Sequence, residues 1–449
     1  MRAIAKANRA LIFSGLYWRF GFRAGEIGQR IMSKALPLFL TVVALLLPNF
    51  AQAWGDPGHI LIAAEAYREL SPEVQAQVFE VLKSHPNFAK WEKVYHPNTN
   101  MDLPTYVFLR CSTWPDEIRG SAIQYDHPNW HFMDYPLRPP SFPFEPDPLP
   151  TNDVLYGVAQ CEKVLSDTNA NPEARAAYLS YMVHLVGDMH QPLHCASYFT
   201  DAYPKGDRGG NDFYVSVNGV GLRLHGLWDG LLGSGVNRRA IWDYAIALET
   251  KFPRTSLPEL TADTTPTAWS LEGRKLAIQY GYLNGELKGS RNQDDAPALP
   301  AGYVAAAKDV AEHQAAKAGY RLADEIQTYL KWSTDLPLLP PNTNNVAEMA
   351  IPAEVSPADV SKYYDETLTV TGKVASVSVT PGIDFIKFEQ PTTEPPFTAV
   401  IFREHTGQFG DLQKLNGREV QISGTVTDFH DKPEIILVST NQMKTIEVQ

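Results

Sequence analysis

The feature that most constrains the fold of this chain is a change in hydrophobic periodicity near residue 332. Before it, apolar residues recur at intervals of three and four, which is typical of helices that bury one face. Beyond it, apolar and polar residues alternate, which is typical of strands. The segments with a helical period are residues 59–70, 71–84, 172–190, 238–252 and 300–330. The sequence therefore predicts a mainly α domain over 54–332, followed by a small all-β domain.

Local sequence signals predict helix starts, a loop and a turn in the first region. Ser71-Pro72-Glu73 and Asn171-Pro172-Glu173 each offer a capping side chain, a proline and an acid, a pattern that favours a helix start. Repeated prolines over residues 134–152 exclude a helix and predict a long surface loop. Asn218-Gly219 predicts the turn of a short hairpin within 211–226.

The second region, residues 352–449, follows a proline-rich linker over 333–351. Its alternating segments predict five strands, at 367–379, 384–390, 397–402, 419–429 and 433–438. Five strands with glycines at probable bends, Gly372 and Gly424, favour a small barrel like the OB-fold.

Barrels of the OB type often bind single-stranded nucleic acid on a basic, aromatic face. Phe385, Phe388, Phe402 and Phe429 are the candidate stacking residues. However, residues 352–449 contain 8 Lys or Arg and 14 Asp or Glu, and alternating phenylalanines ordinarily form a core. We therefore favour a structural or interaction role for this domain over nucleic-acid binding.

The N-terminal segment has the marks of an export signal. Residues 35–47 are almost wholly apolar, too short to span a membrane, and precede the small residues Ala51 and Ala53. We expect cleavage after Ala53 and a periplasmic or secreted protein. Residues 1–31 are unusual for a signal peptide, whereas Met32 would begin an ordinary one, so translation could start there.

Removal of residues 1–53 takes the formal net charge from −12 to −18, since that segment holds seven Lys or Arg and one Glu. Such an acidic chain has no general attraction for phosphate. A polyanionic substrate would need a local positive centre, which bound metal can provide. The cysteines Cys111, Cys161 and Cys195 permit one disulfide and one free thiol, but their spacing does not select a pair.

Histidines and aspartates recur in an order that indicates metal binding. On a helix, His184 and Asp188 are four residues apart and share a face, and His225 and Asp229 repeat this spacing. Imidazole and carboxylate donors suit Zn²⁺, and no CxxC pair is present. Any one of these histidines alone is better explained as a core or surface residue, but the whole set indicates a metal site.

The residues from Trp54 to about Leu330 resemble the zinc-dependent single-strand nuclease and 3′-nucleotidase family of fungi and plants, which is related to bacterial zinc phospholipase C. The resemblance is carried by WGDPGH, WPDEIR, HFMDYP, HLVGDMHQPLH, GGN, LHGLWD and AGYRLA, in that order.

This resemblance implies a mainly helical fold holding three Zn²⁺ ions. One ion would bind Asp116, His131, His184 and Asp188, and a second would bind His194, His225 and Asp229. The third would bind His59, Asp188 and the backbone amine and carbonyl of Trp54. The amine of Trp54 becomes free only when the signal segment is removed.

Four neighbouring residues have secondary expectations. Asp134 could orient the attacking water or a ligand imidazole, and Arg119 could contact phosphate, although a surface arginine is an equal alternative. Asn211 could hold a phosphate or a metal-bound water, and His190 is expected to support the ligands without being one. Gly273 departs from a serine that the family usually has at that position.

The function that these features favour is exported hydrolysis of single-stranded DNA and RNA to 5′-phosphate products, with 3′-nucleotidase activity, by a metal-activated water. One alternative is a zinc phospholipase C acting on lipid head groups, and another is a zinc-stabilised binding module without catalysis. Nucleic acids and 3′-nucleotides are the expected partners, and neither a stable protein partner nor a membrane span in the mature chain is implied.

Overall fold

The computed structural model describes residues 54–95, 101–121, 123–139, 151–233, 235–331 and, apart from 353, 381, 391–395 and 430–431, residues 352–446. The expected signal segment (1–53), the expected linker (333–351, with residue 332) and residues 140–150 of the expected loop lie outside this range. No helix in the described ranges is both long and apolar enough to cross a membrane.

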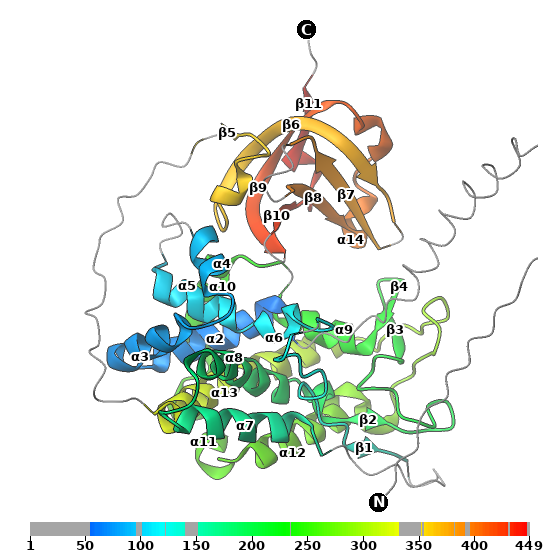
Figure 1. Cartoon of the computed structure of the whole chain (residues 1–449). Coiled ribbons are helices and arrows are strands. Elements are labelled where there is room, and N and C mark those ends of the chain that lie inside the picture. The colour runs from blue at the N-terminus through cyan, green and yellow to red at the C-terminus, as the bar shows by residue number, and fades with distance from the viewer. Residues whose placement is uncertain are drawn as a thin grey trace, which may run out of the picture. The chain divides into compact units, whose positions relative to one another are not determined.

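The first region is helical, as the periodicity predicted (Figure 1). Its α-helices are α2 (Asp56–Glu69), α3 (Pro72–Leu82), α4 (Phe88–Val94), α5 (Leu103–Cys111), α6 (Trp114–Glu117), α7 (Val154–Ser166), α8 (Pro172–Met189), α9 (Leu224–Asp229), α10 (Arg238–Lys251), α11 (Glu259–Ala262), α12 (Pro266–Leu276) and α13 (Tyr303–Tyr329). Both expected helix starts are confirmed: Ser71 accepts a hydrogen bond from the amide of Val74, and Asn171 accepts one from that of Glu173.

Helices α2, α8 and α13 form the centre of this region, with one hydrophobic core around them. α8 is buried along most of its length. α13 can approach α2 closely because it presents small residues: a Cβ on Gly319 would lie 2.5 Å from the Cβ of Glu65. This packing fixes the helices that carry the candidate metal ligands.

Helices α5, α7 and α12 were not expected from the sequence. α7 shows why, since Gly157 interrupts its helical pattern. In the fold, that glycine provides clearance, because a Cβ there would lie 2.8 Å from Leu185 and 3.0 Å from Trp130. Tertiary packing here outweighs the low helix propensity of glycine.

Two short sheets belong to the helical region. The expected hairpin is confirmed as β3 (Tyr214–Val217) and β4 (Val220–Arg223), with positive φ at Asn218 (50°) and Gly219 (79°), as a type I′ turn requires. β1 (Pro136–Leu137), inside the proline-rich segment, pairs in parallel with β2 (Ser197–Tyr198). This pairing joins the segment after His131 to the segment after His194.

The second region is a mixed β-sheet with its own core. Its strands are β5 (Glu354–Val355), β6 (Thr367–Ser378), β7 (Ile383–Phe388), β8 (Thr398–Phe402), β9 (Glu419–Phe429), β10 (Lys432–Ile436) and β11 (Met443–Ile446). The five expected strands are confirmed as β6 to β10. The short strands β5 and β11 were not expected, because neither is long enough to show an alternating pattern.

The candidate stacking phenylalanines differ in exposure. Phe388 is buried, with its ring 5.1 Å from that of Phe397 in the sheet core. Phe429, in contrast, is 54% exposed. Phe388 is therefore a core residue and is not available as a stacking surface.

All three cysteines are free and buried, so the possible disulfide is absent among the described residues. Burial raises the pKa of the thiol of Cys111 to about 12. These thiols are packing groups and are not reactive nucleophiles at neutral pH.

Candidate metal centre

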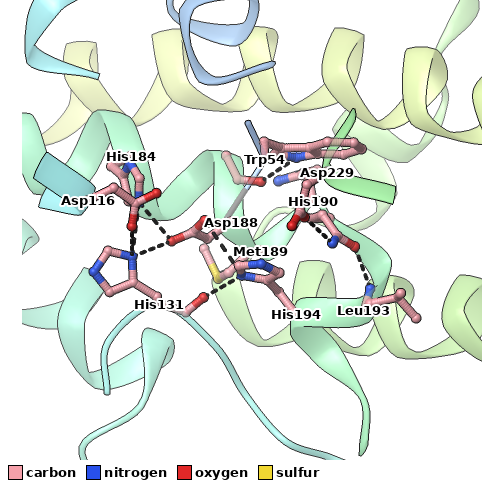
Figure 2. A network of polar contacts seen from close by, with 12 residues as sticks. Trp54, Asp116, His131, His184, Asp188, Met189, His190, Leu193, His194 and Asp229 are labelled. Atoms are coloured by element: carbon pink, nitrogen blue, oxygen red, sulfur yellow. Dashed lines mark hydrogen bonds and ion pairs between the residues drawn. The ribbon is translucent and has the colours of Figure 1, made fainter. Parts of the chain in front are cut away.

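Four of the predicted ligands converge on the buried C-terminal half of α8. Nδ1 of His131 lies 3.0 Å from Nε2 of His184 and 3.1 Å from Oδ2 of Asp188 (Figure 2). Oδ1 of Asp116 lies 3.5 Å from the same His131 nitrogen and 3.7 Å from the His184 nitrogen. Residues far apart in sequence thus present four donor atoms to one point.

These separations match tetrahedral coordination. Donors about 2.0–2.1 Å from a zinc ion in a tetrahedron lie about 3.3 Å from one another. The observed donor separations range from 3.0 to 3.7 Å. The four side chains therefore have the spacing that a first-row divalent metal requires.

A second group comprises His194, His225 and Asp229. His194 lies in the 3₁₀-helix η2 (Pro192–Cys195), and the other two lie on α9. Nε2 of His225 is 3.6 Å from Oδ2 of Asp229, and the two histidine rings stack with centroids 4.9 Å apart. One ligand atom from each residue lies within 4.8 Å of the others, so this group can also hold an ion.

His59 defines a third group. Its ring stacks on that of His184 with centroids 3.9 Å apart, and its Nε2 is 3.5 Å from Oδ1 of Asp188. The geometry also groups His59 with Asp116 and His184, within the same 4.8 Å limit. Asp188 has Oδ1 near His59 and Oδ2 near His131 and His184, which is the arrangement of a bridging ligand.

Trp54 is held beside these groups. Its side chain is fully buried, and its indole Nε1 donates to the carbonyl of Gly187 at 3.0 Å. The next amide, that of Gly55, donates to the carbonyl of Asp229 at 3.1 Å. Figure 2 shows the indole next to Asp229.

Backbone carbonyls set the tautomers of three ligand histidines. Nδ1 of His184 donates to the carbonyl of Ser112, that of His194 to the carbonyl of His131, and that of His225 to the carbonyl of Gly209, each at 2.7 Å. In a neutral imidazole this leaves Nε2 with a free lone pair. All three rings therefore present Nε2 as a metal donor.

The donor atoms satisfy a direct test of metal binding. Buried polar atoms nearly always have hydrogen-bond partners, and a missing partner costs about 1–3 kcal/mol. Several atoms of the predicted ligands that face these groups are buried without such a partner among the described residues: Nε2 of His59 and His194, and Oδ1 of Asp116 and Asp188. Cations bound by these atoms would remove that cost.

The electrostatics of the buried ligand groups also favour metal binding. Burial, with the carboxylates of Asp116 and Asp188 nearby, raises the pKa of Asp229 well above its usual value. Burial opposes protonation of His184, but Asp188 and Asp116 outweigh it and raise its pKa to about 9. The pocket thus concentrates negative charge that divalent cations can neutralise.

The secondary candidates lie at the edge of the groups. Nε of Arg119 lies 3.3 Å from Oδ1 of Asp116, so this side chain pairs with a predicted ligand. Asn211 is buried and donates to the carbonyl of Arg208 at 2.9 Å. Burial, and then the charge of Asp207, raises the pKa of Asp134 to about 6.

Three supporting groups were not anticipated. Gly209 appeared in the sequence only as part of the GGN motif, yet its carbonyl orients His225. The Ser112 carbonyl does the same for His184. Gln191 is fully buried and contacts Asp229. A sequence signal existed only for Gln191, since it lies between His190 and His194.

His190 lies outside the ligand groups, as expected. Its Nδ1 donates to the carbonyl of Val186, and its Nε2 accepts from Arg321 at 2.7 Å. Arg321 also pairs with Glu272, which in turn pairs with Lys317. Lys317 lines a cavity of about 1030 Å³ bounded by α10 to α13, and none of the predicted ligands lines it. This cavity is therefore separate from the metal centre.

This mainly helical domain brings together three His/Asp groups that can bind metal ions, two of them sharing His184 on the buried helix α8. Such a set of donors is the type of site that metal-dependent hydrolases use. The sequence model of one family, S1/P1 Nuclease, matches residues 54–331. The chain belongs to this family and is a nuclease-type hydrolase.

Individual relatives are distant. Nuclease P1 of Penicillium citrinum is 25% identical over 300 residues, covering 61% of this chain and 96% of the relative. Endonuclease 3 of Arabidopsis thaliana is 25% identical over 319 residues, covering 65% and 95%. Nuclease S1 of Aspergillus oryzae is 26% identical over 202 residues, covering 44% and 60%. The family match ends before the β-sheet region.

Proposed function

We propose that the protein is an exported zinc-dependent phosphodiesterase that hydrolyses single-stranded DNA and RNA to 5′-phosphate products and removes the phosphate of 3′-nucleotides. The observation that carries this proposal is the set of buried donor atoms on α8 and its neighbours, within a chain of the nuclease family. The imidazole and carboxylate donors and their tetrahedral spacing support zinc as the metal.

Two sets of residues would act at this site: those that bind the metal ions and those that orient the metal ligands. His59, Asp116, His131, His184, Asp188, His194, His225 and Asp229 would hold three ions, with Trp54 completing the third site. Bound zinc ions lower the pKa of a water and neutralise charge on a phosphate. The carbonyls of Ser112, His131 and Gly209 hold Nδ1 of the three imidazoles and so direct Nε2 inward. Arg119, which pairs with Asp116, would contact phosphate.

Export would also prepare the site. While residue 53 is attached, the nitrogen of Trp54 is an amide and a poor ligand. After cleavage it is an amine that can chelate a metal together with its own carbonyl. The buried side chain of Trp54 and the hydrogen bond from Gly55 to Asp229 would hold this nitrogen beside the ligand groups.

We also propose that the β-sheet region is an OB-like barrel. The supporting observation is a closed circuit of pairings: β6 with β7, β7 with β8, β8 with β10, β10 with β9, and β9 with β6. Only the pair of β8 and β10 in this circuit is parallel. An experimental structure in which β9 does not pair with β6 would contradict this proposal.

The test uses purified protein beginning at Trp54, with bound metal counted by mass spectrometry. Single-stranded DNA, duplex DNA, RNA, 3′-AMP and phosphatidylcholine are compared before and after chelation and on return of zinc. We expect zinc-restored cleavage of the single strands and 3′-AMP. Cleavage of phosphatidylcholine alone would favour the phospholipase alternative, and bound zinc without any hydrolysis would favour the binding module.

A further inference from the structure

Gln191 lies where the segments that carry the ligands meet. It follows α8, which holds His184 and Asp188, and precedes η2, which holds His194. Its side chain is fully buried, with no access for solvent to its amide. Burying a side-chain amide costs free energy unless the amide makes hydrogen bonds.

The orientation of this amide is determined by its neighbours. The backbone N–H of Leu193 donates to Oε1 of Gln191 at 2.6 Å. The opposite end, Nε2, therefore points away from η2 and donates to Oδ1 of Asp229 at 2.8 Å. Because a carboxylate can only accept, and the Leu193 N–H can only donate, a flipped amide would lose both hydrogen bonds.

The contact assigns different roles to the two oxygens of Asp229. Oδ1 is engaged by Gln191, while Oδ2 faces His225 at 3.6 Å from its Nε2. The carboxylate is thus held in one rotation and presents one oxygen to the ligand group. The backbone carbonyl of Asp229 accepts a hydrogen bond from the amide of Gly55, the residue that follows Trp54. The position of Asp229 therefore also affects the position of Trp54.

We propose that Gln191 is a positioning residue for the metal group of His194, His225 and Asp229, holding Asp229 as a single-oxygen ligand. This inference rests on the proposed function for the presence of metal. It deepens that function by naming the side chain that determines how Asp229 binds.

Two substitutions test the role. Gln191→Met keeps the shape but has no donor, and Gln191→Glu replaces the donor by an acceptor that faces Asp229 when ionised. Outer-shell partners of metal ligands typically contribute about 10–100-fold to metal affinity. We expect both variants to bind one of the zinc ions about 10–100-fold more weakly, with the remaining ions retained. The electronic spectrum of Co²⁺ at the weakened site should also change.

The spectrum of bound Co²⁺ separates this role from simple packing, because it reports how the ligands are held at the metal and not whether the chain is folded.

Gln314 on α13 supplies the matched control. It is fully buried, and its Nε2 lies 3.5 Å from the carbonyl of His190, which is not a predicted ligand. Gln314→Glu makes the same change of an amide to a carboxyl group and should leave zinc affinity and the Co²⁺ spectrum as in the natural protein.

The measurement is chelator-competition titration of zinc on the full mature chain without substrate, with far-ultraviolet circular dichroism as the check on folding. Natural zinc affinity in Gln191→Met, or a Co²⁺ spectrum unchanged in both variants, would overturn the proposal. Equal loss in Gln314→Glu would also overturn it. If the natural protein binds zinc but cleaves no nucleotide, the proposed function fails while the role of Gln191 stands.

Discussion

Asp188→Asn is the most demanding test of the metal centre, because it removes a charge but almost no volume. Asp188 is fully buried, and its oxygens lie 3.1 Å from His131, 3.2 Å from His184 and 3.5 Å from His59. One carboxylate therefore serves two predicted ions.

The size of the effect follows from this sharing. A four-donor zinc site in a protein binds with about 10–16 kcal/mol, which divides into about 2.5–4 kcal/mol for each donor. The loss of a charged donor should lower the binding affinity for each of the two ions by about 10²–10³-fold. The site of His194, His225 and Asp229 should keep its ion.

The assay counts zinc per chain by mass spectrometry after dialysis against a weak chelator, alongside cleavage of single-stranded DNA. We expect zinc to fall from three ions to one, with cleavage lost in parallel and partly restored by excess zinc. Asp207→Asn is the control, since Asp207 is equally buried but accepts from the amide of Tyr198 and the hydroxyl of Tyr282. Full zinc content and normal cleavage in Asp188→Asn would refute the bridging assignment.

Three further predictions concern the chain start, a packed glycine and a buried acid. A chain that retains Ala53 should bind the zinc ion near His59 more weakly than one beginning at Trp54, and equal zinc content and cleavage rates would contradict the maturation argument. Gly273→Ser should lower stability by about 1–3 kcal/mol through overpacking, because a Cβ there would lie 2.7 Å from Sγ of Cys195; thermal unfolding measures this, and Cys195→Ala in the same chain should recover part of the loss. Glu65 is buried with neither carboxyl oxygen hydrogen-bonded among the described residues, and burial raises its pKa well above 4.5. Its folded form keeps a proton that the unfolded chain releases, so its contribution to stability should fall by about 1.4 kcal/mol per pH unit above the unfolded value. Denaturant titrations at several pH values should show a shallower decline in Glu65→Gln, and parallel curves would argue against this account.

Much of the fold could be predicted because its signals are local. The caps at Ser71 and Asn171, the turn at Asn218-Gly219 and the strands β6 to β10 each depend on residues close in sequence. α7 could not be predicted in the same way, because the clearance that explains Gly157 is supplied by Leu185 and Trp130 from elsewhere in the chain.

The candidate site shows the same division. The spacing of His184 and Asp188 on one helix predicted that these two side chains would meet, and the structure places them 3.2 Å apart. Nothing in the sequence indicates that the carbonyl of Ser112 or Gly209 reaches an imidazole, since backbone groups are present in every residue. Gly273, where the family usually has serine, is likewise explained only by the folded structure, in which it packs against Cys195.

The use of main-chain carbonyls to orient the imidazoles has an evolutionary consequence. A carbonyl cannot be deleted by a point mutation, so sequence drift at residue 112 or 131 need not disturb the ring that each one orients. Gly209 is the exception, since its φ is 62° and a Cβ there would lie 2.4 Å from the carbonyl oxygen of Leu193. Of the three positions whose carbonyls orient an imidazole, 112, 131 and 209, we therefore expect position 209, which has no side chain, to tolerate substitution least.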